Sequence, residues 1–137
     1  MQYKYETELY PWIKKYFALE GKSFLSFEEV MFFNRRIDIV SYSIQEKIVV
    51  STEAKLKNWG KAIEQCLIYQ LCSDFVYIAM PLDKFKNIDK KILLDNGIGF
   101  MGIDLRGGCT KVIEAAKSKF VKSDYKKEII ERIEENK

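Results

Sequence analysis

The stretch "IDIVSYSIQEKIVVSTEAKL", residues 37–56, decides the fold. It contains two runs rich in Ile and Val with a short polar segment between them, which is typical of two strands joined by a turn. We therefore predict strands at Ile37–Ser43 and Lys47–Leu56. Asp38, Glu53 and Lys55 interrupt these runs at positions where packing alone would favour further apolar side chains, so their presence needs a chemical explanation.

The register of this hairpin determines whether the charged residues meet. If the chain turns symmetrically about Gln45-Glu46, Asp38 lies directly opposite Glu53, with Cβ atoms roughly 4.5–5.5 Å apart. Lys55 then points to the same side, about 7 Å further along the strand. The opposite face would carry Ile37, Ile39, Val50, Ala54 and Leu56. The symmetric turn is an assumption, and a slip of one residue would separate the acids.

Composition limits the chemistry that the chain can perform. The 137 residues suit one domain, residues 1–137, with 47% hydrophobic and 31% charged residues. No apolar run approaches the ~18 residues of a membrane span, and the acidic, tyrosine-rich N-terminus does not resemble a targeting peptide; we expect a cytoplasmic protein without membrane contact. The sequence has no histidine, which excludes Ser-His and Cys-His nucleophile pairs and most zinc sites. The net charge of +3 permits nucleic-acid binding but does not require it.

The hydrophobic patterning of the remaining sequence predicts alternating helices and strands. We expect helices at about 5–19, 60–71, 82–96 and 123–135, and further strands at 24–33, 74–81, 98–105 and about 111–115. Pro11 favours a regular helix that begins near Tyr10, and Asn58 is a candidate cap for the second helix. The glycines at 97, 99 and 102 are expected to allow close backbone approach. The order α-β-β-β-α-β-α-β predicts an α/β single domain, a mixed β-sheet flanked by helices.

A cation would explain the two acids of the hairpin. Carboxylates this close repel each other unless a positive charge lies between them. A divalent metal such as Mg²⁺ would relieve the repulsion, and a lysine beside it could orient a water or neutralise charge on a phosphate. The alternative is a solvated hairpin face that carries Asp38, Glu53 and Lys55 for solubility alone.

Three segments in this order resemble the PD-(D/E)XK nuclease superfamily. They are "RRIDIV" (35–40), "STEAKL" (51–56) and "AIEQCLIY" (62–69). Asp38 matches the aspartate of the first motif, although Ile37 replaces the usual preceding proline. Glu53 and Lys55 match the (D/E)xK motif. Gln65 and Tyr69 match the QxxxY signature of one branch. The resemblance covers about residues 5–105 and implies a restriction-endonuclease-like α-β-β-β-α-β core with a C-terminal helical tail at about 117–137.

The resemblance also implies roles for individual residues. Asp38 and Glu53 would hold Mg²⁺ or Mn²⁺, with the Ala54 carbonyl as a further ligand, and Lys55 would position the attacking water. Gln65 would orient Lys55 or contact a phosphate. Tyr69 would lie one turn further along the same helix, with packing of the helix on the sheet as its alternative role.

The family often adds a glutamate from the first helix. Glu8 is the candidate here, Glu6 is a weaker one, and Glu29 is a competitor from the following strand. Four cations near the hairpin and the second helix are expected to bind phosphates: Arg35, Arg36, Lys57 and Lys61. Ordinary surface charge is the alternative for each.

These expectations lead to one functional hypothesis and two alternatives. The leading hypothesis is a hydrolase: a Mg²⁺-dependent endo- or exodeoxyribonuclease that cleaves phosphodiester bonds with a metal-activated water and leaves a 5′-phosphate. It would be selective for DNA structure or part of a larger repair, defence or mobile-element system, with RNA as another substrate. A homodimer or a nuclease complex is an open prediction, for which the lightly apolar C-terminal helix would supply an interface. The alternatives are a catalytically inactive, nuclease-like domain that binds nucleic acid or protein, and a plain assembly protein.

Overall fold

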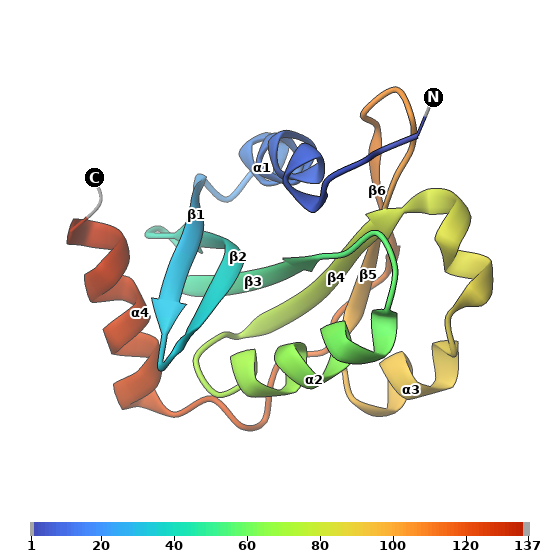
Figure 1. Ribbon diagram of the computed structural model, residues 1–137. Coiled ribbons are helices and arrows are strands. Elements are labelled where there is room, and N and C mark those ends of the chain that lie inside the picture. The colour runs from blue at the N-terminus through green and yellow to red at the C-terminus, as the bar shows by residue number, and fades with distance from the viewer. Residues whose placement is uncertain (1, 136–137) are drawn as a thin grey trace.

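A computed structural model describes residues 2–135 as one six-stranded mixed sheet flanked by helices (Figure 1). The strands follow chain order across the sheet: β1 (Phe24–Phe32), β2 (Arg35–Ser43), β3 (Ile48–Ala54), β4 (Phe75–Pro81), β5 (Gly99–Ile103) and β6 (Cys109–Ile113). The β3–β4 and β4–β5 pairs are parallel, and the other pairs are antiparallel. The helices are η1 (Glu6–Leu9), α1 (Tyr10–Leu19), α2 (Trp59–Tyr69), η2 (Leu82–Asn87), α3 (Lys90–Asp95) and α4 (Ser123–Glu135), where η denotes a 3₁₀ helix. The predicted α/β class is confirmed.

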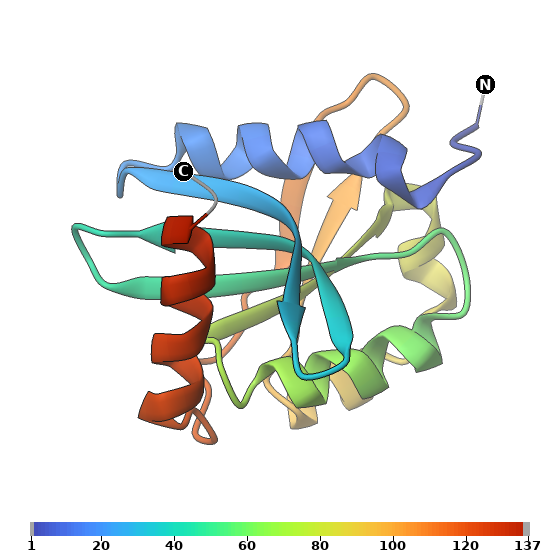
Figure 2. The same ribbon diagram turned by 60° about the vertical axis from the view of Figure 1, so that its left-hand side comes forward.

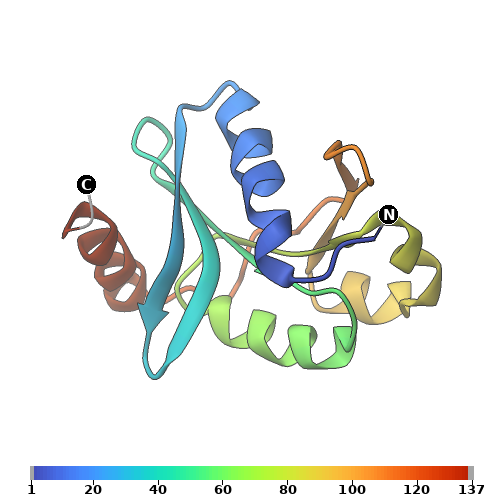
Figure 3. The same cartoon turned by 45° about the horizontal axis from the view of Figure 1, so that its top comes forward.

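Helices cover the two faces of the sheet unequally. Helix α1 lies alone across one face, and α2 and α3 lie on the other (Figures 1 and 3). Leu9, Ile13 and Phe17 of the η1–α1 segment are buried at helical spacing against Ile39 and Val50 of the sheet. No helix within residues 2–135 is long and apolar enough to cross a membrane.

The predicted hairpin register is confirmed where β2 and β3 pair. Ile39 lies opposite Thr52 and Ser43 lies opposite Ile48, so paired numbers sum to 91 as the symmetric turn requires. The predicted face is wrong for Ile37, which packs in the cluster under α2 and not with Ile39. The change coincides with a gap in the β1–β2 ladder between the Glu28–Ile39 and Val30–Ile37 pairs, where Glu29 has a left-handed backbone (φ 54°).

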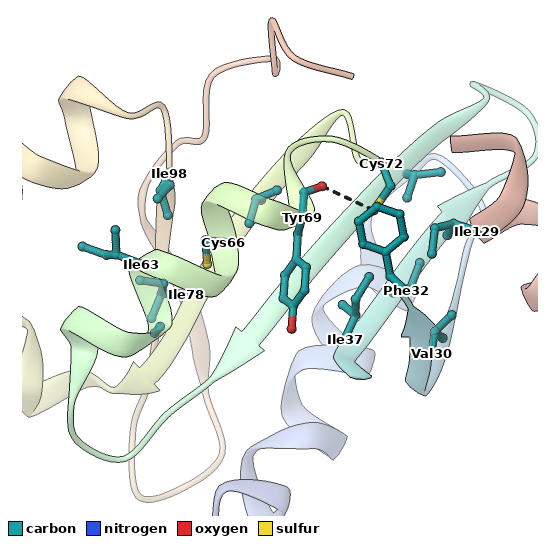
Figure 4. Packing of buried hydrophobic residues seen from close by; sticks show 14 of the residues in the cluster. Val30, Phe32, Ile37, Ile63, Cys66, Tyr69, Cys72, Ile78, Ile98 and Ile129 are labelled. Atoms are coloured by element: carbon teal, nitrogen blue, oxygen red, sulfur yellow. Dashed lines mark hydrogen bonds between the residues drawn. The ribbon is translucent and has the colours of Figure 1, made fainter. Parts of the chain in front are cut away.

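Helix α2 packs against the sheet, chiefly on β3 and β4. Figure 4 shows Ile63, Cys66 and Tyr69 on the helix face that meets the sheet, with Ile37 and Phe32 on the strands beside them. Cys66 and Tyr69 have no exposed surface. This packing fixes the helix relative to the carboxyl end of β3, and Gln65 lies four residues before Tyr69 on the same helix.

Two predicted helical features differ in the structure. The expected helix at 82–96 is divided into η2 and α3, because Ile88 is extended and buried and Asp89 then caps α3 by accepting a hydrogen bond from the Lys91 N–H at 3.0 Å. Asn58 does precede α2, but its side chain makes no capping bond; its backbone is left-handed instead (φ 61°). The expectation for the glycines is supported at Gly99, where an added Cβ would lie 2.3 Å from the Tyr77 ring.

The C-terminal helix belongs to the core. Ile129 and Ile133 of α4 are fully buried and share a cluster with Val30 and Phe32 of β1. Figure 2 shows α4 standing beside the β1–β2 side of the sheet. These two isoleucines are therefore already used within the chain, and the oligomeric state stays a prediction.

Lys47 offers a test of backbone strain in the β2–β3 turn. It is exposed and left-handed (φ 57°), a conformation that costs a residue with a Cβ roughly 1–2 kcal/mol. Glycine avoids this cost but loses about 0.5–1 kcal/mol more chain entropy on folding. Lys47→Gly should therefore raise the free energy of unfolding in urea by about 0.5–1 kcal/mol, whereas Lys47→Ala, which keeps the Cβ, should give no gain.

Candidate active site at the carboxyl end of strand β3

The two acids meet where β2 and β3 separate. Ile39 and Thr52 are the last residues that pair in the β2–β3 ladder, and Asp38 and Glu53 are the next residue on each strand. Lys55 follows β3 and is held beside β4 by a hydrogen bond from its N–H to the Ala79 carbonyl at 3.0 Å. The site thus lies at the carboxyl edge of the parallel part of the sheet, where ligands of open α/β sheets commonly bind.

Asp38 is fixed by donors from two elements. Its Oδ2 accepts the Ala54 N–H at 2.8 Å, and its Oδ1 accepts the Tyr10 hydroxyl of α1 at 2.9 Å. Sequence reasoning missed Tyr10. The available signal was its position one residue after Leu9 in a stripe of buried residues, since a buried tyrosine hydroxyl needs a polar partner.

Glu53 is fixed from the α2 side. Its side chain is nearly inaccessible to solvent, at 3% exposure. With its amide oriented to satisfy both groups, Gln65 donates from Nε2 to Glu53 Oε1 at 3.1 Å and also to Oε2. Lys55 Nζ lies 3.8 Å from Glu53 Oε2 and is only partly exposed. Lys55, which follows β3, and Gln65 of α2 therefore converge on the Glu53 carboxylate.

Burial and mutual repulsion change the acidity of the pair. Burial, together with the charge of Asp38, raises the pKa of Glu53 to about 8, and the lysine at 3.8 Å opposes this shift. Burial also raises the pKa of Asp38, against the hydrogen bonds from Ala54 and Tyr10. The pKa of Tyr10 is raised by burial and by Asp38, so its hydroxyl stays a donor at neutral pH. Without a cation, the pair therefore retains a proton near pH 7.

Tyr69 connects the site to the β1–β2 hairpin. Its hydroxyl donates to the Arg36 carbonyl at 3.2 Å and lies 3.4 Å from the Gln65 amide. Burial raises the pKa of this tyrosine, followed by the charges of Glu53 and Asp38. Its ring has no exposed surface. These contacts suit a residue that positions Gln65 and the helix.

Among the three candidate glutamates, the structure brings Glu6 to the acids and not Glu8. Glu8 is exposed, and its Oε1 accepts the N–H groups of Lys4 at 2.6 Å and Tyr5 at 2.8 Å, so it caps η1. Glu6 Oε2 accepts the Leu56 N–H at 3.3 Å, just past the site, and its charge raises the pKa of both Asp38 and Glu53. Glu29 is exposed, at the gap in the β1–β2 ladder between the Glu28–Ile39 and Val30–Ile37 pairs.

The four predicted phosphate-binding cations flank the acids in two pairs. Arg35 and Arg36 begin β2 beside the Tyr69 end of α2, and Lys57 and Lys61 lie at the opposite end of that helix. Figure 2 shows the turn between β1 and β2 next to α2. All four side chains are exposed, so each is accessible to a ligand.

The oxygen atoms at the site match a hard divalent cation. Within residues 2–135, no group of three or more Cys, Asp and Glu side chains is placed to hold a metal. Mg²⁺ does not require such a group, since it commonly uses one or two carboxylates and keeps several waters. The Asp38 and Glu53 carboxylates, which repel each other in a buried setting, supply that number. In an extended strand the carbonyl of a residue points to the same side as its N–H, and the Ala54 N–H points to Asp38.

Comparisons with known proteins identify the fold but not the activity. No protein-family model matches the chain, and no curated protein matches it. Among solved structures, the chain is similar to the SPO1766 protein of unknown function from Silicibacter pomeroyi, with a TM-score of 0.75 and 17% sequence identity. The match covers 99% of this chain and 88% of that chain. At this identity the likeness shows a shared fold alone.

Proposed function

We propose that this protein is a metal-dependent nuclease with a restriction-endonuclease-like core. The observation that carries the proposal is the pair formed by the half-buried Asp38 and the buried Glu53, with Lys55 at 3.8 Å from Glu53 and Gln65 bonded to it. Two acids whose pKa values are both raised by removal from water destabilise an apoprotein, so their presence together calls for a cation that they bind. The helix and strand order of α1 to β4 is also the order that the PD-(D/E)XK resemblance implies.

The residues present suit Mg²⁺ or Mn²⁺. Asp38 and Glu53 would hold the ion, the Ala54 carbonyl would supply a further oxygen, and Glu6 is near enough to add charge or accept a proton from a water ligand. A bound ion would lower the pKa of a water molecule and stabilise negative charge on the phosphate.

The other residues of the site have roles that follow from their contacts. Lys55 carries its charge into a partly buried position beside Glu53, where it can orient a water or neutralise charge on a phosphate oxygen. Gln65 holds the Glu53 carboxylate in one orientation. Tyr10 does the same for Asp38, and its contact spans from α1 to the sheet. Helices on the two faces of the sheet thus hold the two carboxylates in place: α1 holds Asp38 and α2 holds Glu53. Catalysis requires such fixed positions.

Cleavage of a substrate panel tests the proposal. The panel contains labelled single-stranded DNA, linear duplex, flap, four-way junction and RNA, each with Mg²⁺ or Mn²⁺ and with EDTA. We expect the wild type to cleave at least one DNA substrate, with loss of cleavage in EDTA. Lys55→Met should lower the rate by about 10²–10³-fold, the loss typical of removing one preorganised electrostatic group. Lys90→Met, in the first turn of α3, is the matched control and should cleave like the wild type.

The panel also separates the proposal from its main alternative. A nuclease-like binding domain would bind nucleic acid with a salt-dependent affinity but show no metal-dependent cleavage. Cleavage that continues unchanged in EDTA, or in Lys55→Met, would contradict the assigned site. Absence of cleavage on every substrate, together with tight binding by the wild type, would replace the nuclease by the binding domain.

A further inference from the structure

A cavity of about 1010 Å³ lies beside the candidate active site, at the carboxyl ends of β3, β4 and β5. Four segments line it: residues 2–4, residues 56–57 after β3, residues 81–84 at the start of η2, and residues 103–106 after β5. Figure 3 shows the N-terminal segment beside the chain that leaves β4. Leu56 and Lys57 come directly after Lys55, and Glu6 bonds the Leu56 N–H, so the cavity and the site share one wall.

The charge of the cavity favours an anion. Four cations line it, Lys4, Lys57, Lys84 and Arg106, and none of them forms an ion pair with an acid in residues 2–135. Two acids also line it, Asp83 and Asp104. The Asp104 carboxylate is occupied, because its Oδ1 accepts the N–H groups of Arg106 and Gly108, each at 2.8 Å. The cations thus outnumber the acids of the lining, and their charges are not neutralised by ion pairs within the described part of the chain.

Apart from Gln2, the rest of the lining is apolar and aromatic. Tyr3 is held in place by its hydroxyl, which donates to the Asp104 carbonyl at 2.6 Å. Leu82 and Leu105 are 41% and 61% exposed, which is high for large apolar side chains. A duplex would present mainly phosphates to such a wall, whereas an unpaired strand presents both phosphates and base faces. Cations combined with aromatic and apolar surface are the pattern of single-strand binding.

We propose that this cavity binds a single-stranded segment of nucleic acid, with Lys84 and Arg106 on its phosphates and Tyr3, Leu82 and Leu105 against its bases. The proposal deepens the proposed function, since it specifies an unpaired end or flap as the preferred substrate form. The preference for a cleaved substrate rests on the proposed nuclease function, but binding of a single strand to the cavity can be measured without cleavage.

Binding of a fluorescent 12-nucleotide DNA in EDTA, measured by anisotropy at several salt concentrations, tests this site. The test variant is Lys84→Gln with Arg106→Gln. The control is Lys117→Gln with Lys119→Gln. These exposed lysines flank Ser118, whose N–H donates to the carbonyl of Asp74 just before β4, whereas the cavity lies at the other end of that strand. Loss of two phosphate contacts should weaken binding and reduce the slope of log affinity against log salt by about 1.4, or 2 × 0.7. The control should match the wild type.

The outcomes separate this proposal from the nuclease proposal. Unchanged affinity and salt slope in the Lys84 and Arg106 variant would overturn the cavity site even if the wild type cleaves DNA. Weaker binding confined to blunt duplex would overturn it as well, because the cavity would then contact only paired DNA. A reduced salt slope for single strands in a protein that never cleaves would support the cavity while the nuclease proposal fails. Use of a 12-nucleotide RNA beside the DNA shows which sugar the cavity accepts.

Discussion

Replacing Glu53 with Gln should lower Mg²⁺-dependent cleavage by about 10³-fold, the loss typical of removing one preorganised electrostatic group. Glutamine has nearly the same shape, and its side-chain oxygen can still accept from the Gln65 amide. The variant changes only the charge available to a cation beside Asp38. Single-turnover rates on the best substrate of the panel, with enzyme in excess, measure the effect on the chemical step alone.

Glu64→Gln is the matched control for this variant. Glu64 is exposed on α2, next to Gln65 in sequence, so the same substitution there changes the net charge equally without touching the site. It should cleave within about twofold of the wild type, since surface substitutions of this kind have small effects. A rate for Glu53→Gln equal to that of the Glu64 control would show that Glu53 holds no catalytic ion.

The part of the site that the sequence predicted correctly depends on the regular period of strands. A turn assumed to be symmetric about Gln45-Glu46 gives a register that buries Ile39 and Val50 together, and the structure has that register. The proximity of Asp38 and Glu53 follows from it. The (D/E)xK spacing likewise follows from a strand, because residues two apart point to one side.

The part that was not predictable depends on local departures from regular geometry. Glu8 is the sequence candidate because it lies beside the apolar stripe of the first helix, but the turn that holds it is a 3₁₀ helix, which has a different period from the α-helix that follows. The change of period turns Glu8 towards the backbone at Lys4 and Tyr5 and turns Glu6 towards Leu56. Ile37 changes face at the point where the β1–β2 ladder is interrupted beside the left-handed Glu29, a backbone conformation that is uncommon for glutamate.

In EDTA, the free energy of unfolding should fall as the pH rises from about 4.5 to about 8. The pKa of Glu53 is about 8 in the folded protein and about 4.5 for an ordinary glutamate, so in this window the folded state holds a proton that the unfolded chain has released. Raising the pH then removes stability, by about 1.4 kcal/mol per pH unit while the difference is one full proton. Below the lower value and above the upper one, this residue contributes no slope. Asp38 shifts in the same direction and adds to the effect.

Urea unfolding at half-unit steps between pH 5 and 8.5, followed by circular dichroism, measures this dependence. Glu53→Gln should show a much shallower fall and exceed the stability of the wild type near pH 8, because the buried charge is absent. Glu64→Gln should keep the wild-type slope. Saturating Mg²⁺ should stabilise the wild type most at the upper end of the range, where the ion replaces the retained proton, and should leave Glu53→Gln nearly unchanged. Identical slopes for the wild type and Glu53→Gln would show that Glu53 is ionised in the folded protein at neutral pH, and the buried pair would then need no cation to explain it.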